Sequence, residues 1–300
     1  MIGTMTTSDR AETFSERRAR KRAETRAEEE FAKAHNAATS YGAALRGYAR
    51  QIATIVHAHA QADPPLVPPH KQPELENALR RYAAGTAPWA NAAASKMVAE
   101  VHRRNLTAWQ THAATMSAGI KRQIFTAPVG EAMRGLLAEQ VNLITSLPLR
   151  AARRVHEATL EALVAGDRYQ EQTAIESGYD PDTDTWTRGE PTMSTDLELA
   201  LAKAHPNATS RWLLNRATLI ARTETARTAS TLVQAQAQSV GAESYIWKTA
   251  GDWKVRPSHK KLNNHEFRWD DPPLSDPPDY HAHPGQIWNC RCVALPIITE

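Results

Sequence analysis

The sequence predicts an α+β protein that is predominantly α-helical, with long N-terminal helices, a helical middle region and a small C-terminal α+β module. Three observations lead to this prediction. Apolar residues recur at alternating spacings of three and four from Phe31 to His59, which is the heptad pattern of a packed helix. Helical spacing then continues through the middle of the chain. After Gly241, short runs rich in aromatic and β-branched residues replace it.

Residues 1–127 are predicted to form an elongated helical region. It opens with a run of charges of alternating sign, which is typical of an exposed helix. An apolar seam follows, and we expect it to lie on one uninterrupted helix that packs on another helix and ends before Asp63. The seam consists of Phe31, Ala34, Ala38, Tyr41, Leu45, Tyr48, Ile52, Ile55 and His59. Between Pro73 and Ser117 we expect two or three further helices, with a break at Pro88.

Residues 128–177 are predicted to be a helical middle region. Pro128 suits the start of a helix, and apolar residues follow at helical spacing as far as Leu147. Pro148 is expected to end this helix, because proline lacks the N–H donor and clashes with the preceding turn. A second helix is expected to run to Gly166. Residues 178–193 concentrate Asp, Pro and Gly, so they are predicted to be a linker at a domain boundary.

Residues 194–300 are predicted to form the C-terminal module, with helices first and a small sheet after them. The helical pattern runs from Ser194 to Gly241. Three strands are then expected, and the last of them is apolar on both faces. The strands are expected at residues 245–249, 267–269 and 290–298.

Composition limits the class of protein. The 300 residues include 36 Lys and Arg against 33 Asp and Glu, and a net charge of +3 is too small for the one-signed field of a dedicated nucleic-acid binder. The charged N-terminal segment lacks the apolar stretch of a secretory signal, and no segment approaches the roughly 20 apolar residues of a membrane span. We therefore expect a soluble protein without a signal peptide, made in the cytoplasm.

Charged residues on one predicted helix form the first candidate site. Arg222 and Arg227 flank Glu224 along this helix. The three side chains can form a solvated ladder of ion pairs. Alternatively, Glu224 and one arginine are buried partners that fix the helix onto the small sheet, where the loss of one partner would be costly. The sequence leaves both interpretations open.

Arg256 and His259 form the second candidate site. Their spacing of three places both side chains on one face if they lie in the first turn of a helix. Such a pair can bind phosphate, and in ribonuclease chemistry a histidine moves a proton while an arginine holds the phosphate. These two residues and His283 are the catalytic candidates if the chain is an enzyme. Because the sequence fixes no complementary acid, we expect a protein that is not an enzyme.

The two cysteines of the chain, Cys290 and Cys292, form the third candidate site. In an extended strand their side chains point to the same face, because strand side chains alternate with a period of two. Together with His259 and His283 they would complete a two-cysteine, two-histidine set for tetrahedral zinc.

The alternative for the cysteines needs no cofactor, and it is the one we expect. Both thiols are then small buried apolar groups of a cytosolic protein. In this interpretation Arg291, which lies between them, pairs with Asp270 or Asp271.

Four local patterns, taken in order, resemble the Mu F-like head-morphogenesis proteins of tailed phages, which are also described as minor capsid proteins. The resemblance covers roughly residues 129–296, and the segment between Gly166 and Ser194 departs from the family pattern. The four patterns are VNLITSLP at residues 141–148, RATLIARTETAR at 216–227, WKT at 247–249 followed by VRPSH at 255–259, and HPG at 283–285 followed by NCRC at 289–292. Each is weak alone, whereas the ordered set is specific.

The resemblance implies a structural minor head protein rather than an enzyme. It implies a place inside the procapsid or virion, with the portal, scaffold and capsid proteins as partners and possible contact with packaged DNA. The basic residues available for such phosphate contacts are Lys121, Arg122, Arg150, Arg153 and Arg154. The structural motif residues that it implies are Arg222, Glu224, Arg227, Trp247, Arg256, His259, Asp270, His283, Pro284, Asn289, Cys290, Arg291 and Cys292.

Two other classes of function stay open. One is a nuclease or toxin-like effector that uses Arg256 and His259. The other is a zinc-binding interaction module built on the cysteines.

Overall fold

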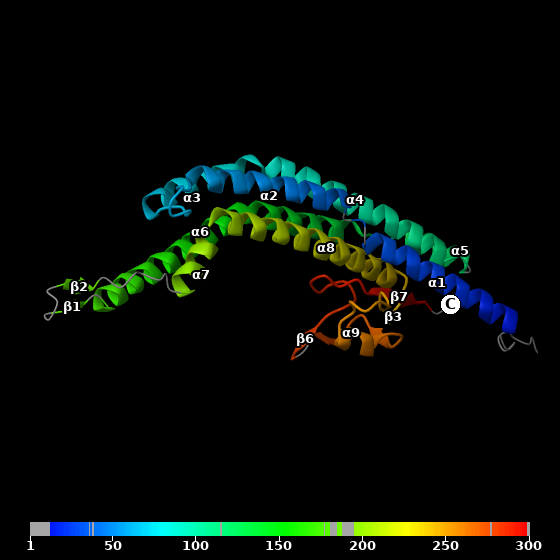
Figure 1. The fold of residues 1–300 in the computed structure, drawn as a ribbon. Helices are drawn as coiled ribbons and strands as arrows, with labels where there is room; N and C mark the ends of the chain where they lie inside the picture. Colours follow the sequence, from blue (N-terminus) through cyan, green and yellow to red (C-terminus); the bar gives the residue numbers. More distant parts are fainter. Residues whose placement is uncertain are drawn as a thin grey trace, which may run out of the picture. The chain divides into compact units, whose positions relative to one another are not determined.

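The computed structural model (Figure 1) describes residues 13–35, 37, 39–114, 116–176, 178–180, 185–187, 195–276 and 278–298. It confirms the α+β class, because long helices dominate and the strands form small antiparallel sheets. The chain divides into two compact units, each made of separate stretches of sequence. The first unit is Met1–Ala38, Lys96–Leu136 and Arg222–Glu300, and the second is Thr39–Ser95 and Leu137–Ala221. The division into regions 1–127, 128–177, 178–193 and 194–300 stays a prediction.

The second unit is built from helices. It contains α2 (Thr39–His59), the short 3-10 helix η1 (Pro69–Lys71), α3 (Gln72–Gly85), α7 (Thr195–Ala204), and parts of α4 (Ala87–His112), α6 (Gly130–Glu176) and α8 (Pro206–Ser239). The α2 seam is buried in this unit. There the ring of Tyr48 stacks on Tyr82 and Trp89, at centroid distances of 5.4 and 5.0 Å. The Tyr41 hydroxyl donates a hydrogen bond to Oε1 of Gln140 over 3.0 Å.

The first unit combines helices with the C-terminal sheet. It contains α1 (Phe14–His35), α5 (Ala118–Phe125), α9 (Pro257–Leu262), the sheet β4-β3-β7 and the two-stranded sheet of β5 (Leu274–Asp276) and β6 (Tyr280–His281). The central strand β3 (Ser244–Lys248) pairs antiparallel with β4 (Glu266–Arg268) and β7 (Val293–Ile297). One hydrophobic core joins helices and sheet, and it includes Phe31, Trp109, Trp247, Cys290 and Cys292.

The apolar seam lies on two helices, so the prediction of one uninterrupted helix is wrong. Helix α1 ends at His35 and α2 begins at Thr39, with a turn at Ala37 between them. Asn36 and Ala38 lie outside the described residues. Heptad spacing specifies which positions are buried, and the same positions can be buried from two consecutive helices. Thr39 and Ser40 are residue types that favour helix starts, a signal that the apolar spacing obscured.

Helix α6 continues through Pro148 to Glu176, so the helix end predicted at Pro148 and the stop at Gly166 are wrong. Proline removes one backbone hydrogen bond, but burial of Ile144, Leu147 and Ala151 on either side of it holds the helix in place. The hydroxyl of Ser146 donates to the carbonyl of Leu143 over 3.1 Å within the same stretch of helix.

The strand predictions are confirmed for two of the three segments. Strand β3 and strand β4 lie at the expected places, whereas β7 begins only at Val293, after both cysteines. The predicted linker contains two short paired strands, β1 (Gly178–Asp180) and β2 (Thr185–Thr187). Residues 181–184 and 188–193 of that segment lie outside the described residues, as do Ser194 and Pro277. No helix within the described ranges has the length and apolar character needed to cross a bilayer.

Candidate metal centre

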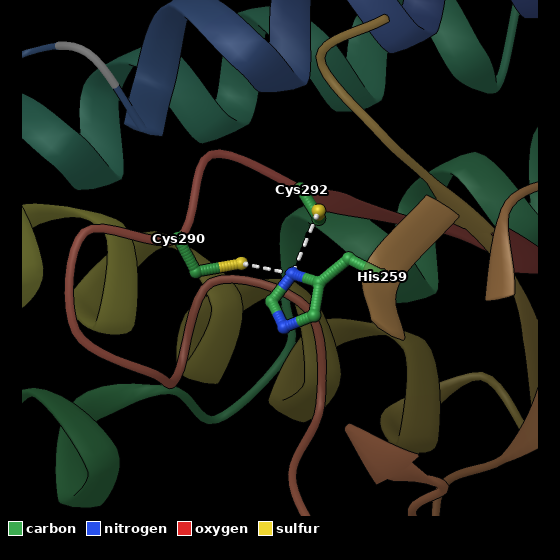
Figure 2. A group of neighbouring side chains, drawn as sticks. All are labelled: His259, Cys290 and Cys292. Atoms are coloured by element: carbon green, nitrogen blue, oxygen red, sulfur yellow. Dashed lines mark hydrogen bonds between the residues drawn. The ribbon is translucent and has the colours of Figure 1, made fainter. Parts of the chain in front are cut away.

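His259, Cys290 and Cys292 come together in the first unit. Arg256 precedes α9, and Pro257 starts the helix, where a missing N–H costs nothing. Within α9, His259 faces the core, and its Nδ1 atom lies 3.6 Å from Sγ of Cys290 and 3.4 Å from Sγ of Cys292. Figure 2 shows Nδ1 directed at both sulfur atoms, while the other ring nitrogen points away from them. All three ligand atoms lie within 4.8 Å of one another.

The segment before β7 carries both cysteines in an irregular conformation. Gly285 has φ +83°, and its N–H donates a hydrogen bond to Sγ of Cys290 over 3.3 Å. A Cβ atom at this position would lie 2.5 Å from Cε1 of His35, so both the backbone angle and the space require glycine. Asn289 also has positive φ, +54°, and its N–H donates to Oγ1 of Thr223 on α8 over 3.2 Å. These bonds hold the cysteine segment against the helices of its own unit.

The two thiols share their protons unequally. The hydrogen bond from the Cys292 thiol, assisted by His259, holds the pKa of Cys290 well below its ordinary value. The hydrogen bond to Cys290, together with burial, raises the pKa of Cys292. Burial lowers the pKa of the neighbouring His35 to about 4, against the opposing effect of the Cys290 charge, so its ring is neutral at physiological pH. The cluster therefore combines a thiol whose pKa is lowered, a thiol whose pKa is raised and an imidazole ring, and sulfur and imidazole donors suit a soft or borderline metal ion.

A cavity of about 160 Å³ adjoins the cluster, and its wall is cationic. The residues around it are Ala250, Lys254, Val255, Arg256, His259, Asn289, Cys290, Arg291 and Cys292. Arg256 and His259 therefore do line one space, as their spacing predicts. The Arg256 guanidinium donates to the backbone carbonyl of Trp288 over 2.8 Å.

Arg291 pairs with Asp252, so the predicted pairing with Asp270 or Asp271 is wrong. Its guanidinium donates to both carboxylate oxygens of Asp252, over 2.7 and 2.6 Å. Asp270 instead accepts from Arg268 over 2.8 and 2.9 Å. Arg268 lies only two residues away from Asp270, and this local partner satisfies the carboxylate.

His283 lies outside the cluster, so the structure does not bring the predicted four-residue zinc set together. Nδ1 of His283 is hydrogen-bonded to the hydroxyl of Tyr245 over 2.9 Å, and its ring lies 5.3 Å from that of Trp269. The strand argument for the two cysteines also fails, because both precede β7. Their sulfur atoms converge on His259 through the irregular segment instead.

The charged group on α8 matches the buried interpretation better than the solvated ladder. Glu224 is 8% exposed, and one of its oxygens lies 3.6 Å from Nη1 of Arg227. Arg222 is exposed on the same helix. Trp247 of β3 is fully buried and packs edge-on against His259, with ring centroids 5.3 Å apart. Pro284 is also buried, next to His283.

Four residues that build the site are not among the predicted site residues, although Gly285 and Thr223 lie within the quoted patterns. Asp252 and Gly285 lie in turns whose residue types were visible, because Gly-Asp and Pro-Gly pairs favour turns. Thr223 and His35 belong to helices, and nothing in their local spacing distinguishes them. Only the fold brings these two residues to the cysteine segment.

Comparison with known proteins gives a match over the C-terminal half. Residues 153–295 match the family model described as phage Mu protein F like protein. A Haemophilus influenzae protein, described as uncharacterized, is 26% identical over 170 residues, which are 57% of this chain and 30% of that protein. The chain thus spans less than a third of the length of this relative. No solved structure shows significant similarity to the chain.

Proposed function

We propose that this chain is a structural minor protein of a tailed-phage head that acts in head morphogenesis, because residues 153–295 match the family model described as phage Mu protein F like protein. The family match is the observation that carries the proposal. Three of the four sequence patterns lie within the matched residues, and the pattern at 141–148 precedes them.

Contacts between the patterns support a shared structural role. The second pattern meets the fourth where Asn289 donates to Thr223. The third meets the fourth where His259 contacts Cys290 and Cys292. Residues that are far apart in the sequence thus interlock inside one unit, which is what a stable assembly module requires.

We also propose that the protein has a structural role and catalyses no reaction. His259 is 2% exposed, and its Nδ1 faces the two thiols. His283 is 6% exposed and bonded to Tyr245. A general acid and base must both reach the substrate, and these two histidines occupy separate buried environments. Their packing supports a structural role over the nuclease or toxin alternative.

The portal, scaffold and capsid proteins are the proposed partners, and the proposed location is the interior of the procapsid and virion. Exposed tryptophans support a protein-binding role, since aromatic side chains dominate the energetics of many interfaces. Trp253 is 83% exposed and Trp288 is 53% exposed, and both belong to the first unit.

Packaged DNA is a further proposed contact. Arg150 and Arg153 are exposed on α6, and Arg122 is exposed on α5. Arg154 is only partly exposed, and it lies over the ring of Trp212 at 5.5 Å. Arginines on exposed helix faces can contact phosphates without reading sequence.

Co-expression with the portal, scaffold and major capsid genes of the same phage tests the proposed function. After gradient sedimentation, we expect the full-length chain to migrate with procapsids. A variant in which Trp253 and Trp288 are both alanine is the matched test of the partner surface, and we expect less of it in that fraction. A wild-type chain that stays at the top of the gradient while procapsids form would refute the proposal.

A further inference from the structure

The three donor atoms of the His259, Cys290 and Cys292 cluster have the spacing of ligands around one tetrahedral ion. Zinc binds thiolate sulfur at about 2.3 Å and imidazole nitrogen at about 2.1 Å, so tetrahedral angles place a sulfur and a nitrogen ligand about 3.6 Å apart. The two distances from Nδ1 of His259 to the sulfurs are 3.6 and 3.4 Å. Both nitrogen-to-sulfur distances therefore match those of ligands around one tetrahedral zinc ion, and the third pair, the two sulfurs, lies within 4.8 Å.

The surroundings of the sulfurs suit metal-bound thiolates. Cys290 and Cys292 are 4% and 2% exposed, and both are free cysteines. The N–H of Gly285 points at Sγ of Cys290 from 3.3 Å, and such a bond stabilises negative charge on sulfur. The positive charge of Arg291 lies between the two thiols in the sequence and lines the same cavity. A hydrogen bond from an N–H group and a nearby positive charge both stabilise negative charge on buried sulfur atoms.

All three donor residues line the adjoining cavity, which offers space for a fourth ligand. The residues that line the cavity supply no carboxylate, thiol or imidazole other than the three ligands themselves. His283 is engaged with Tyr245 instead. A solvent molecule can therefore complete the tetrahedron.

We propose that Nδ1 of His259 and the Sγ atoms of Cys290 and Cys292 bind one zinc ion, with a solvent molecule as the fourth ligand. The ion ties α9 to the segment that precedes β7, two elements that are 31 to 33 positions apart in the sequence. Thiolate and imidazole ligands favour zinc over magnesium or calcium, which prefer oxygen. The ion acts as a structural clamp, because ligand binding to the folded state alone stabilises that state.

The zinc content of the untagged full-length chain tests this assignment. The protein is loaded with zinc, dialysed against metal-free buffer and measured by elemental mass spectrometry. We expect about one zinc per chain in the wild type and an at least tenfold lower content in Cys292→Ser and His259→Gln. His283→Gln is the matched control, because His283 is also a buried histidine of this unit, and we expect it to keep the ion. Wild-type protein without zinc, or full occupancy in Cys292→Ser, overturns the proposal.

A spectroscopic test on the wild type does not depend on whether the variants fold. Cobalt replaces zinc in the loaded protein, and we expect thiolate-to-cobalt charge-transfer absorption together with the strong visible bands of a tetrahedral site. X-ray absorption at the zinc edge should show two sulfur neighbours at about 2.3 Å and two lighter neighbours at about 2.1 Å. A shell of light atoms alone, or of four sulfurs shared between two chains, overturns the proposal.

The zinc assignment and the head assignment fail independently. Zinc content is measured on the isolated chain, whereas head association is measured in particles. A zinc-free chain found in procapsids refutes only the metal site, and a zinc-loaded chain that never joins procapsids refutes only the head role.

Discussion

Nδ1 of His259 lies 3.4 Å from Sγ of Cys292, although 33 positions separate the two residues in the chain. This contact joins the short helix α9 to the segment that leads into β7. The buried Trp247 ring packs against the same histidine in a T-shaped arrangement. The C-terminal module is therefore held together at a point where sulfur, imidazole and indole meet.

Removal of zinc should lower the stability of the zinc-loaded chain. An ion present at 100 times its dissociation constant contributes about 2.7 kcal/mol to the folded state. We therefore expect a strong chelator to lower the thermal midpoint of the wild type, measured by circular dichroism. Cys292→Ser should show the same midpoint with and without chelator. A thermal midpoint of the wild type that does not change when chelator is added contradicts the proposal that zinc acts as a structural clamp.

Substitution of Gly285 should be severely destabilising. Gly285→Ala places a Cβ atom against the ring of His35 and forces positive φ on a residue with a side chain. We expect a loss well above about 1 kcal/mol in urea denaturation. Gly135→Ala is the control, because the space around this helical glycine is empty, and it should raise stability by up to about 1 kcal/mol. Equal effects of the two substitutions would count against the packing described here.

Acid should destabilise the first unit through His112. Burial lowers the pKa of this histidine, against the opposing effects of the Pro296 carbonyl, which its Nε2 contacts at 2.9 Å, and of the Glu24 charge. In the unfolded state, histidine has a pKa of about 6.5. As the pH falls below this value, His112 is protonated in the unfolded state but remains neutral in the folded state, and this difference favours unfolding. The contribution of His112 to the free energy of unfolding is therefore fully present above about pH 6.5, and it is lost as the pH falls towards the lower pKa of the folded state.

The measurement is urea denaturation between pH 7 and pH 5, with chelator present so that zinc release does not contribute. His112→Gln, which can still donate to the Pro296 carbonyl, should reduce the pH dependence, and the remaining slope comes from other buried histidines such as His35, whose pKa is about 4. His265→Gln, at an exposed histidine, should leave it unchanged. A slope that is identical in wild type and His112→Gln would refute the assignment.

The continuity of α6 predicts the effect of replacing its internal proline. Pro148→Ala restores a helical hydrogen bond and should raise stability, with about 3 kcal/mol as the upper limit. Pro206→Ala is the control, because Pro206 is the first residue of α8, where proline is tolerated. If α6 ended at Pro148, the alanine variant would gain nothing over this control.

The sequence was informative wherever local spacing decides structure. It predicted the fold class, the apolar seam, the break near Pro88 and the strands β3 and β4, because side-chain periodicity reports burial directly. It failed where tertiary packing overrides a local signal. The buried flanks of Pro148 keep α6 intact, and the break between His35 and Thr39 leaves the heptad spacing undisturbed.

The candidate site was predictable in its residues but not in its geometry. His259, Cys290, Cys292 and Arg256 were identified by type and spacing, and the fold brings all four to one cavity. The exclusion of His283 and the pairing of Arg291 with Asp252 depend on contacts across 38 and 39 positions. No local pattern encodes contacts of that range.

The number of copies of the chain in purified phage heads tests the central claim most directly. Heads from a phage that lacks the gene, complemented with wild type or with Arg256→Gln, are analysed by quantitative mass spectrometry, and the purified proteins are assayed on DNA and RNA. We predict equal copy numbers and equal infectivity for the two proteins, with no cleavage by either. Absence of the chain from wild-type heads, or nucleic-acid cleavage by the wild type that Arg256→Gln abolishes, would contradict the account.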